Sequence, residues 1–361
     1  MIALLIIYGL LALAELFLVI SFANRFKTPA GKPSKFTEVS VLVCARNEEE
    51  NLPAILDSLL ASDHDLTKIE ILVGDDNSTD GTKEIISQYA HDHHCITYVH
   101  IAENKDGLIA KGNVLAQLVD IAQYEKVLII DADMKVSKSW LSTMAELLDE
   151  NDLISGLTMV DKDFYRPRAQ FFDWAVVLHT MKTMSDISQP ISILGNNMGF
   201  KRTVYENVGG FRALGPTDVE DLALLRRFQS SGLKTFQYVG GKGKAFTKGQ
   251  DGWKAMIQQR CRWMNGVFTH HWLVGIPALF ARLWFVIALS TWPFSGTASA
   301  AIMIYGLLFN SVKYFQLTAK ANNRYIFALH LPALISLLDT FALIRILLFG
   351  KVTWKGREFK K

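Results

Sequence analysis

Three apolar stretches that are almost free of charge flank a charged central segment in this sequence. Residues 1–22 carry one charge, at Glu15, residues 283–312 carry none, and residues 325–350 carry one acid and one base apart from a histidine. An α-helix needs about 20 apolar residues to cross the hydrocarbon core of a bilayer. Each stretch is long enough, so the sequence predicts a membrane protein with a soluble domain between the first stretch and the second.

Basic residues beside the apolar stretches predict which side of the membrane the central domain faces. Four basic residues and no acid lie between positions 25 and 35, and the tail 351–361 is also basic. Positive charge favours the cytosolic side of a span. We therefore expect the domain and the tail in the cytosol, at the inner membrane if the protein is bacterial. No basic residue precedes the first stretch, which favours a retained anchor at 1–22 over a signal peptide.

The number of later spans is less clear from the sequence. One span before the domain and two within residues 283–350 place both the domain and the tail in the cytosol. They also leave three basic residues of the loop between the two late spans on the far side. The alternative adds a span over residues 272–293, which would bury Arg282 and place the tail outside. We prefer two late spans and interpret residues 267–282 as an interfacial amphipathic segment.

Charged residues inside a membrane need partners. Glu15 and Arg345 lie at similar distances from the cytosolic ends of the first and last stretches. We expect these two residues to form an ion pair that holds the two helices together. Asp339 lies deeper in its stretch, and we expect it to pack against another polar group.

The composition excludes several classes of protein. The chain is 50% hydrophobic and 20% charged, which is too apolar for an ordinary soluble domain and too charged for a pure membrane bundle. Cys44, Cys95 and Cys261 lack metal-ligand spacing, and a reducing cytosol does not favour disulfides. The net charge is only +3, with the basic residues grouped at membrane edges, so no nucleic-acid partner is expected.

Between residues 37 and 266, short apolar runs alternate with helical segments. The runs are typical of parallel strands buried on both faces, and they cover Val39–Cys44, Ile69–Gly74, Lys126–Ile130 and Leu153–Met159. Helices are predicted between them, over residues 48–61, 81–90, 110–123 and 137–149. This alternation predicts an α/β domain with a doubly wound, Rossmann-like sheet.

Polar residues with candidate chemistry follow the ends of these strands. Residues 45–48 (Ala-Arg-Asn-Glu) follow the first, Asp75 and Asp76 the second, and Asp131 and Asp133 a later one. Ligands of such sheets bind beyond the carboxyl ends of the strands. Asp76 could accept hydrogen bonds from a base N–H and a ribose hydroxyl, although a polar turn is the alternative role for an acidic pair there.

Acidic residues at two places suggest a metal site and a catalytic base. Asp131 and Asp133 are two residues apart, and Mg²⁺ usually takes one or two carboxylates plus substrate phosphates. Glu220 and Asp221 open a helical run, where acids often interact only with the helix dipole. In a site with the other acids, Asp221 is the candidate general base for an acceptor hydroxyl, with Glu220 supporting it.

A late cluster on a predicted helix supplies cationic and aromatic groups. Gln259, Arg262 and Trp263 share or adjoin one helix face. Arg262 can bind a diphosphate with two parallel bonds and stabilise it as a leaving group, while Trp263 offers an apolar wall. We interpret Arg260, between them, as an interfacial residue. Lys111 could reach a phosphate, and a solvated lysine is the alternative.

These motifs together resemble the family 2 glycosyltransferases, in particular the membrane-integrated branch with ceramide glucosyltransferases, bacterial lipid and carotenoid glycosyltransferases, and poly-β-sugar synthases. The resemblance rests on the order Asp-Asp, Asp-x-Asp, Glu-Asp and Q-x-x-R-W, and it covers roughly residues 38–266. It implies a GT-A fold, a nucleotide-sugar donor that is most often UDP-linked, Mg²⁺ or Mn²⁺, and inversion at the anomeric carbon.

The resemblance also implies roles by position. Asp76 matches the uracil-contacting acid, Asp131 and Asp133 match the metal and diphosphate motif, and Asp221 matches the catalytic base. The nucleoside pocket corresponds to Ala45, Arg46, Asn47 and Glu48. The diphosphate and acceptor cluster corresponds to Gln259, Arg262 and Trp263.

The membrane spans favour an acceptor that lives in the bilayer, such as a membrane lipid, a carotenoid or a polyprenyl compound. A processive β-polysaccharide synthase is the alternative, although such synthases usually carry more spans. An alternative of another class is a non-catalytic membrane scaffold that binds nucleotide-sugars; the intact Asp221 and Arg262 argue against it.

Overall fold

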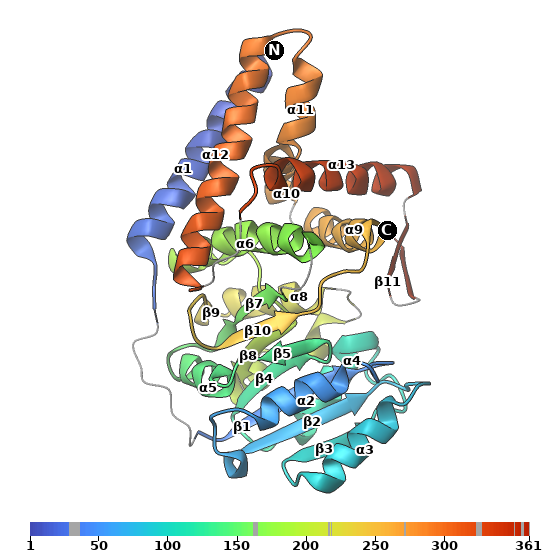
Figure 1. Ribbon diagram of the computed structural model, residues 1–361. Coiled ribbons are helices and arrows are strands. Elements are labelled where there is room, and N and C mark those ends of the chain that lie inside the picture. Colours follow the sequence, from blue (N-terminus) through green and yellow to red (C-terminus); the bar gives the residue numbers. More distant parts are fainter. Residues whose placement is uncertain are drawn as a thin grey trace.

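An α/β domain and a block of helices lie one above the other in the computed structural model of the chain (Figure 1). The helices of the upper block come from both ends of the sequence and from residues 165–186, and the α/β domain comes from the rest of the segment between the two ends. The structure describes residues 1–28, 37–161, 165–215, 217, 219–270, 272–322, 327–349, 351–354 and 357–360.

A seven-stranded sheet forms the centre of the α/β domain. In spatial order its strands are β3 (Ile96–His100), β2 (Ile69–Asp75), β1 (Val39–Ala45), β4 (Lys126–Asp131), β8 (Asn197–Lys201), β6 (Leu153–Ser155) and β9 (Thr235–Gln237). The first four strands are parallel, and β8 is antiparallel to both of its neighbours. The predicted α/β sheet is confirmed, with β8 making it mixed.

The predicted strand over residues 153–159 divides at Gly156. Its first part is β6, and its second part is β7 (Leu157–Val160), which joins β10 (Lys244–Thr247) and β5 (Met134–Val136) in a small sheet. A side chain at Gly156 would approach the amide of Asn197 to about 2.5 Å. Only glycine therefore fits where the chain passes from one sheet to the other.

Helices cover both faces of the large sheet. The short connecting helices are α2 (Leu52–Leu60), α3 (Thr82–Asp92), α4 (Ala110–Ile121), α5 (Trp140–Glu150), α7 (Arg202–Asn207) and α8 (Glu220–Ser230), with 3-10 turns at Leu66–Lys68 and Phe211–Leu214. Alternate residues of β1 point to opposite faces, so that Val41 and Val43 lie in one core cluster and Leu42 in another. This double burial explains the unbroken apolar runs of the sequence.

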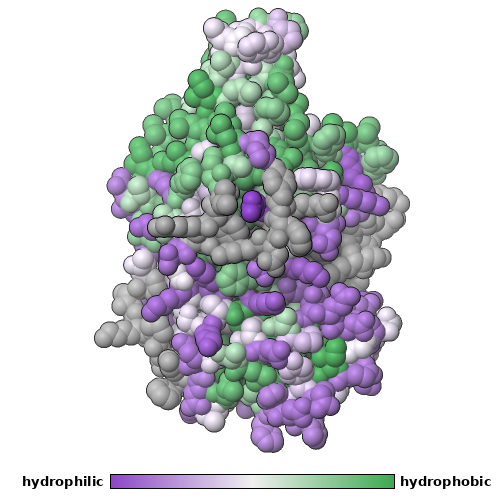
Figure 2. Space-filling model, viewed as in Figure 1, coloured by the Kyte–Doolittle hydropathy of each residue, from purple (hydrophilic) through white to green (hydrophobic). Residues whose placement is uncertain are grey.

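Other helices of the described chain form the upper block. They are α1 (Ile2–Arg25), α6 (Tyr165–Asp186), α9 (Trp253–His270), α10 (Trp272–Arg282), α11 (Trp284–Thr291), α12 (Gly296–Lys320) and α13 (Leu331–Phe349). Three of these, α1, α12 and α13, are long and apolar enough to cross a membrane. Figure 2 shows that the visible surface of this block is mainly hydrophobic, whereas polar residues predominate on the α/β domain. The length of these three helices and the hydrophobic surface of the upper block therefore both indicate membrane association.

The stretch 283–312 is divided between two antiparallel helices. The chain rises through α11, turns at residues 292–295 and descends through α12, beside α1 (Figure 1). Proline at position 293 breaks the helical hydrogen bonding, and the Ser295 hydroxyl accepts the Ala298 N–H at 3.2 Å to begin α12. The turn thus has a local sequence cause.

The expected ion pair between Glu15 and Arg345 is wrong. The Lys313 ammonium contacts the Glu15 carboxylate and donates to the Thr180 hydroxyl at 3.1 Å. The physical reason is that α12 runs beside α1, whereas α13 lies across these helices (Figure 1). Glu15 therefore pairs with a residue of α12.

A charge exchange tests this pair. Glu15→Lys should strongly reduce the yield of monomeric protein in detergent, because it places two cations together in a buried position. Adding Lys313→Glu should restore the yield, whereas adding Arg345→Glu should not. Size-exclusion chromatography and thermal unfolding would measure both. Rescue by the Arg345 variant and not by the Lys313 variant would contradict the pairing seen here.

Candidate active site

The ends of three parallel strands bring the predicted acids to one edge of the sheet. β1 lies between β2 and β4, with Ala45 opposite Asp75 and Cys44 opposite Asp131. The carboxyl ends of adjacent parallel strands form the ligand-binding edge in folds of this class. The prediction that these acids lie together is therefore explained by strand register.

The loops after β1 and β2 are joined by hydrogen bonds. Arg46 Nη1 donates to the carboxylate and to the backbone carbonyl of Asp76, both at 3.2 Å. The Asn47 side-chain oxygen accepts the Thr79 N–H at 2.8 Å, and the Asn47 N–H donates to the Ser78 hydroxyl at 3.0 Å. Arg46, Asn47 and Asp76 thus form one rigid wall of the site.

Other residues at this edge have internal roles. Buried Asp75 accepts the Ser78 N–H at 3.0 Å and the Tyr98 hydroxyl at 3.2 Å. Buried Glu48 accepts from the Asn51 amide at 2.7 Å. Asp75 holds the turn after β2, so the two members of the Asp-Asp motif differ in function. Ala45 is buried as well, and its carbonyl accepts the Asp76 N–H at 2.9 Å.

Lys111 connects the end of β4 with the start of α8. Its ammonium donates to Asp131 Oδ1 at 2.5 Å and to the Gly195 carbonyl at 2.9 Å, and it lies 3.9 Å from Glu220 Oε1. Burial opposes its charge, but Asp131 and Glu220 outweigh burial and raise the pKa of Lys111 above its ordinary value. The interpretation as a freely solvated lysine is therefore wrong, and a fixed cation lies in the site.

Glu220 and Asp221 occupy the first turn of α8. Burial raises the pKa of Glu220 to about 7, and Asp221 adds to the rise while Lys111 opposes it. Asp221 Oδ2 accepts the Gly195 N–H at 2.9 Å, and its Oδ1 accepts the Leu222 N–H at 2.7 Å. A Cβ at Gly195 would lie 2.7 Å from the Asp221 carboxylate. Gly195 therefore permits the close approach that holds both Asp221 and Lys111.

Cys44 is a residue that the sequence analysis missed at this site. It precedes the loop after β1, and Lys111, Asp131, Glu220 and Asp76 all lie close enough to affect its thiol. Burial is the largest effect and raises the pKa of Cys44, so the thiol stays neutral. Its position at the end of the first predicted strand was the signal that could have placed it here.

Asp131 and Asp133 are suited to a divalent cation by chemistry. Both side chains are half-buried at the end of β4, and their oxygens suit Mg²⁺ or Mn²⁺ when substrate phosphates complete the coordination. Among the residues that the structure describes, no three His, Cys, Asp or Glu side chains are grouped as a metal cage. A site completed by substrate fits this pair better than a resident structural metal.

The cluster Gln259, Arg262 and Trp263 lies on α9, as predicted for a helix. Trp263 packs edge-on against Trp174 of α6, with ring centroids 5.6 Å apart at 85°. Its approach to the carboxylates of β4 and α8 stays a prediction. The interpretation of Arg260 as an interfacial residue is wrong, because its side chain is only 2% exposed and is paired with acids of other helices.

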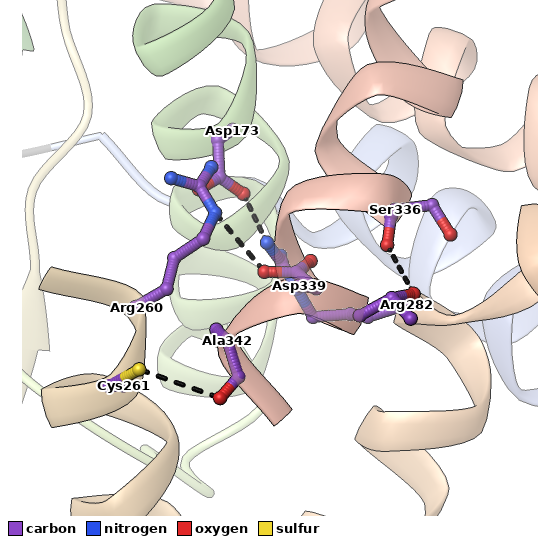
Figure 3. A network of polar contacts seen from close by, with 8 residues as sticks. Asp173, Arg260, Cys261, Arg282, Ser336, Asp339 and Ala342 are labelled. Atoms are coloured by element: carbon purple, nitrogen blue, oxygen red, sulfur yellow. Dashed lines mark hydrogen bonds and ion pairs between the residues drawn. The ribbon is translucent and has the colours of Figure 1, made fainter. Parts of the chain in front are cut away.

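Arg260 belongs to a closed network of four charged residues, three of them almost completely buried (Figure 3). It donates to Asp173 at 2.7 Å and to Asp339 at 3.1 Å. Arg282 donates to the other oxygens of the same acids, at 2.5 and 2.7 Å. We call Asp173, Arg260, Arg282 and Asp339 the charge quartet; it joins α6, α9, α10 and α13. The expectation that Asp339 contacts a polar group is confirmed.

Comparisons with known proteins place the chain in a family. Residues 40–209 match the family described as Glycosyl transferase family 2. Residues 126–343, more than half of the chain, match Glycosyl transferase family group 2. The two matches together include every acidic cluster and the helix α9.

Individual relatives are distant. The beta-monoglucosyldiacylglycerol synthase of Nostoc sp. is 23% identical over 246 residues, which are 64% of this chain and 49% of that protein. The 4,4'-diaponeurosporenoate glycosyltransferase of Staphylococcus haemolyticus is 24% identical over 291 residues, 73% of this chain and 70% of that protein. The chain thus spans about half the length of the first relative.

A solved structure resembles nearly the whole chain. The mannosyltransferase PcManGT from Pyrobaculum calidifontis, in complex with GDP-Man and Mn²⁺, superposes with a TM-score of 0.58 at 18% identity. The match covers 96% of this chain and 99% of that one, so the fold extends into the apolar helices. On these matches, the chain is a member of glycosyltransferase family 2 with the GT-A fold.

Proposed function

We propose that this protein is an inverting glycosyltransferase that moves a sugar from a UDP-linked donor to a hydroxyl of a membrane lipid, on the cytosolic side of the membrane. One observation carries the reaction type. The Asp221 carboxylate is held by two backbone N–H groups, next to a lysine that joins Asp131 to Glu220. This arrangement supports the proposal, because a carboxylate, a fixed cation and an oxygen-rich strand end lie together.

Each group has a role in this proposal. Arg46 and Asp76 bind the nucleoside, and Asp131 with Asp133 would hold Mg²⁺ or Mn²⁺, which supplies positive charge to the diphosphate. Lys111 and Arg262 bind the same diphosphate from the protein side. Asp221 removes the proton of the acceptor hydroxyl.

The covalent change is a single displacement. As Asp221 takes the proton, the acceptor oxygen forms a bond to C1 of the sugar, and the bond from C1 to the diphosphate oxygen breaks on the opposite face. The nucleoside diphosphate leaves with the electron pair. Only one base is required, and no carboxylate has to act as a nucleophile, which supports inversion.

The arrangement of the two halves of the molecule supports a lipid acceptor. The apolar helices lie next to the α/β domain, with α6 and α9 between it and α1, α11 and α12 (Figure 1). Two relatives have names that contain diacylglycerol and diaponeurosporenoate. An acceptor held in the bilayer could therefore present its hydroxyl beside the catalytic domain.

The proposed function is tested by nucleotide release from the detergent-purified full chain. UDP-sugars and GDP-mannose would be supplied with Mn²⁺ or Mg²⁺, with and without extracted membrane lipids. We expect release of UDP that requires both metal and lipid, with a glycolipid product. Polymer formed without added lipid would indicate a polysaccharide synthase, and release only from GDP-mannose would overturn the UDP assignment. Donor binding without release would indicate a scaffold.

The ionisation of Glu220 should appear in the pH dependence. With its pKa near 7, Glu220 is neutral at lower pH and ionised at higher pH. Ionised Glu220 places negative charge beside Asp221 and strengthens it as a base, so kcat/KM for the donor should rise with pH through about 7. Glu220→Gln, which cannot ionise, should lack this inflection. Initial rates over a pH series would show it, and an unchanged inflection in the variant would contradict the assignment.

A further inference from the structure

We propose that α13 lies in the plane of the membrane, at the boundary between lipid headgroups and acyl chains, and does not cross the bilayer. The helix has 19 residues and is apolar enough to span by composition alone. Its packing in the fold indicates otherwise. The partner that this helix binds is therefore the membrane leaflet next to the catalytic domain.

The direction of α13 differs from that of the other two candidate spans. α1 and α12 have 24 and 25 residues, which corresponds to about 36 Å of helix, enough to cross a hydrocarbon core of about 30 Å. They run side by side and define the direction of the membrane normal. Figure 1 shows α13 crossing this direction, next to α6 and α9 on their side away from the α/β domain.

One face of α13 is fixed to its neighbours by polar contacts. Asp339 bonds to Arg260 of α9 and Arg282 of α10 in the charge quartet (Figure 3). One turn before it, the Ser336 hydroxyl accepts the Phe285 N–H at 3.2 Å, and one turn after it, the Ala342 carbonyl accepts from the Cys261 thiol at 3.5 Å. Ser336, Asp339 and Ala342 are spaced three residues apart, so these contacts hold one side of α13 against its neighbours over about two turns. They therefore prevent α13 from tilting into the bilayer.

The opposite face of α13 is apolar and exposed. Phe341, Ile344 and Leu348 are spaced three and four residues apart, so they lie on one side of the helix, and they are 57%, 45% and 70% exposed. An in-plane helix buries such a face about 5–10 Å into the boundary of headgroups and acyl chains. The exposed face thus matches lipid along the whole second half of the helix.

The chain after α13 returns toward the catalytic domain. Strand β11 (Lys351–Trp354) pairs with β12 (Arg357–Lys360) and contacts α9. An in-plane α13 keeps this basic tail and the end of α12 at Lys320 on the side of the catalytic domain. Among the residues that the structure describes, only the turn at 292–295 and the start of α1 then reach the far side. This topology also removes the conflict with the positive-inside rule that two late spans created.

Membrane depth measurements test the proposal without relying on activity. Nitroxide labels at Phe341→Cys and Leu348→Cys, in a full-length chain with the native cysteines replaced, would be compared in lipid vesicles by collision with oxygen and with a water-soluble nickel chelate. The positions are seven residues apart, or about 10 Å along a helix. We expect nearly equal depths for this pair.

Ile6→Cys and Leu13→Cys form the matched control, because they are also exposed and seven residues apart, but on α1. They should differ in depth by about 10 Å. A similar difference for the α13 pair, or no difference for the α1 pair, would overturn the proposal.

Sidedness gives a second, independent measurement. A membrane-impermeant maleimide should label Asn322→Cys and a cysteine placed after Lys361 from the same side as Asp92→Cys in the catalytic domain. It should label Phe294→Cys from the opposite side. A tail on the same side as Phe294 would show that α13 crosses the bilayer, and Asn322 on that side would exclude the hairpin of α11 and α12.

Discussion

Asp221→Asn is expected to lower the turnover of the nucleotide-sugar by about 10²- to 10⁴-fold, the usual contribution of a general base. The amide has the shape of the carboxylate and can still accept the Gly195 N–H, but it cannot take a proton from the acceptor. Donor binding should change little, because Asp221 acts on the acceptor. Single-turnover rates of sugar transfer, together with the dissociation constant of the donor, would measure both effects.

The matched control is Asp92→Asn, the same chemical change on an exposed carboxylate at the end of α3. It should leave transfer unchanged. Transfer that survives in Asp221→Asn at the original rate would exclude this residue as the base. If Asp221→Asn weakens donor binding while the rate of sugar transfer in the bound complex is unchanged, Asp221 acts in substrate binding.

Asp339→Asn is expected to lower the free energy of unfolding by about 3–5 kcal/mol, because removing one member of a buried ion pair leaves an uncompensated charge. In the charge quartet, both arginines would then share Asp173 alone. The side chains of Asp173, Arg260 and Asp339 are almost completely buried, and solvent cannot replace the lost partner. Denaturant unfolding in mixed micelles would measure the change.

A double-mutant cycle separates the network from simple loss of packing. Asp339→Asn combined with Arg282→Gln removes one charge of each sign and leaves the pair of Arg260 with Asp173. The double variant should therefore be less destabilised than the sum of the single variants. Arg345→Gln, on the same helix but outside the charge quartet, serves as the control and should have a small effect. Strict additivity would show that the four charges do not act together.

Local sequence patterns predicted β1, β2, β4 and β6 of the large sheet, because those patterns arise from burial. The other strands of that sheet, β3, β8 and β9, were not predicted. A strand covered on both faces is apolar at nearly every position, as β1 is from Val41 to Val43. The buried Ser40 before them donates a hydrogen bond to Glu70. The acids after these strands were found for the same reason, since parallel register brings Asp131 and the loop after β1 to one edge. Sequence alone could not show that Asp75 is a structural residue, because its partners come from a turn and another strand.

Partners of isolated charges could not be predicted, because they depend on how distant helices pack. Glu15, Arg260 and Asp339 each have partners on other helices, and these partners lie from 57 to 298 positions away in the sequence. The hydrophobic periodicity of the sequence does not show which helices lie side by side. The predicted pair of Glu15 with Arg345 assumed that α1 and α13 run side by side. In the structure α13 lies across α1, so this assumption is wrong.

Hydropathy by itself determined that this protein associates with a membrane, and its motif order determined the family, because both properties depend on residue type and spacing along the chain. Only the tertiary structure decided that Lys111 joins Asp131 to Glu220, that Gly195 holds Asp221, and that α13 lies across the other apolar helices. The physical reason is that an apolar helix lowers its free energy equally well beside lipid or beside protein. The buried charges of the charge quartet, which must be paired, decide between the two.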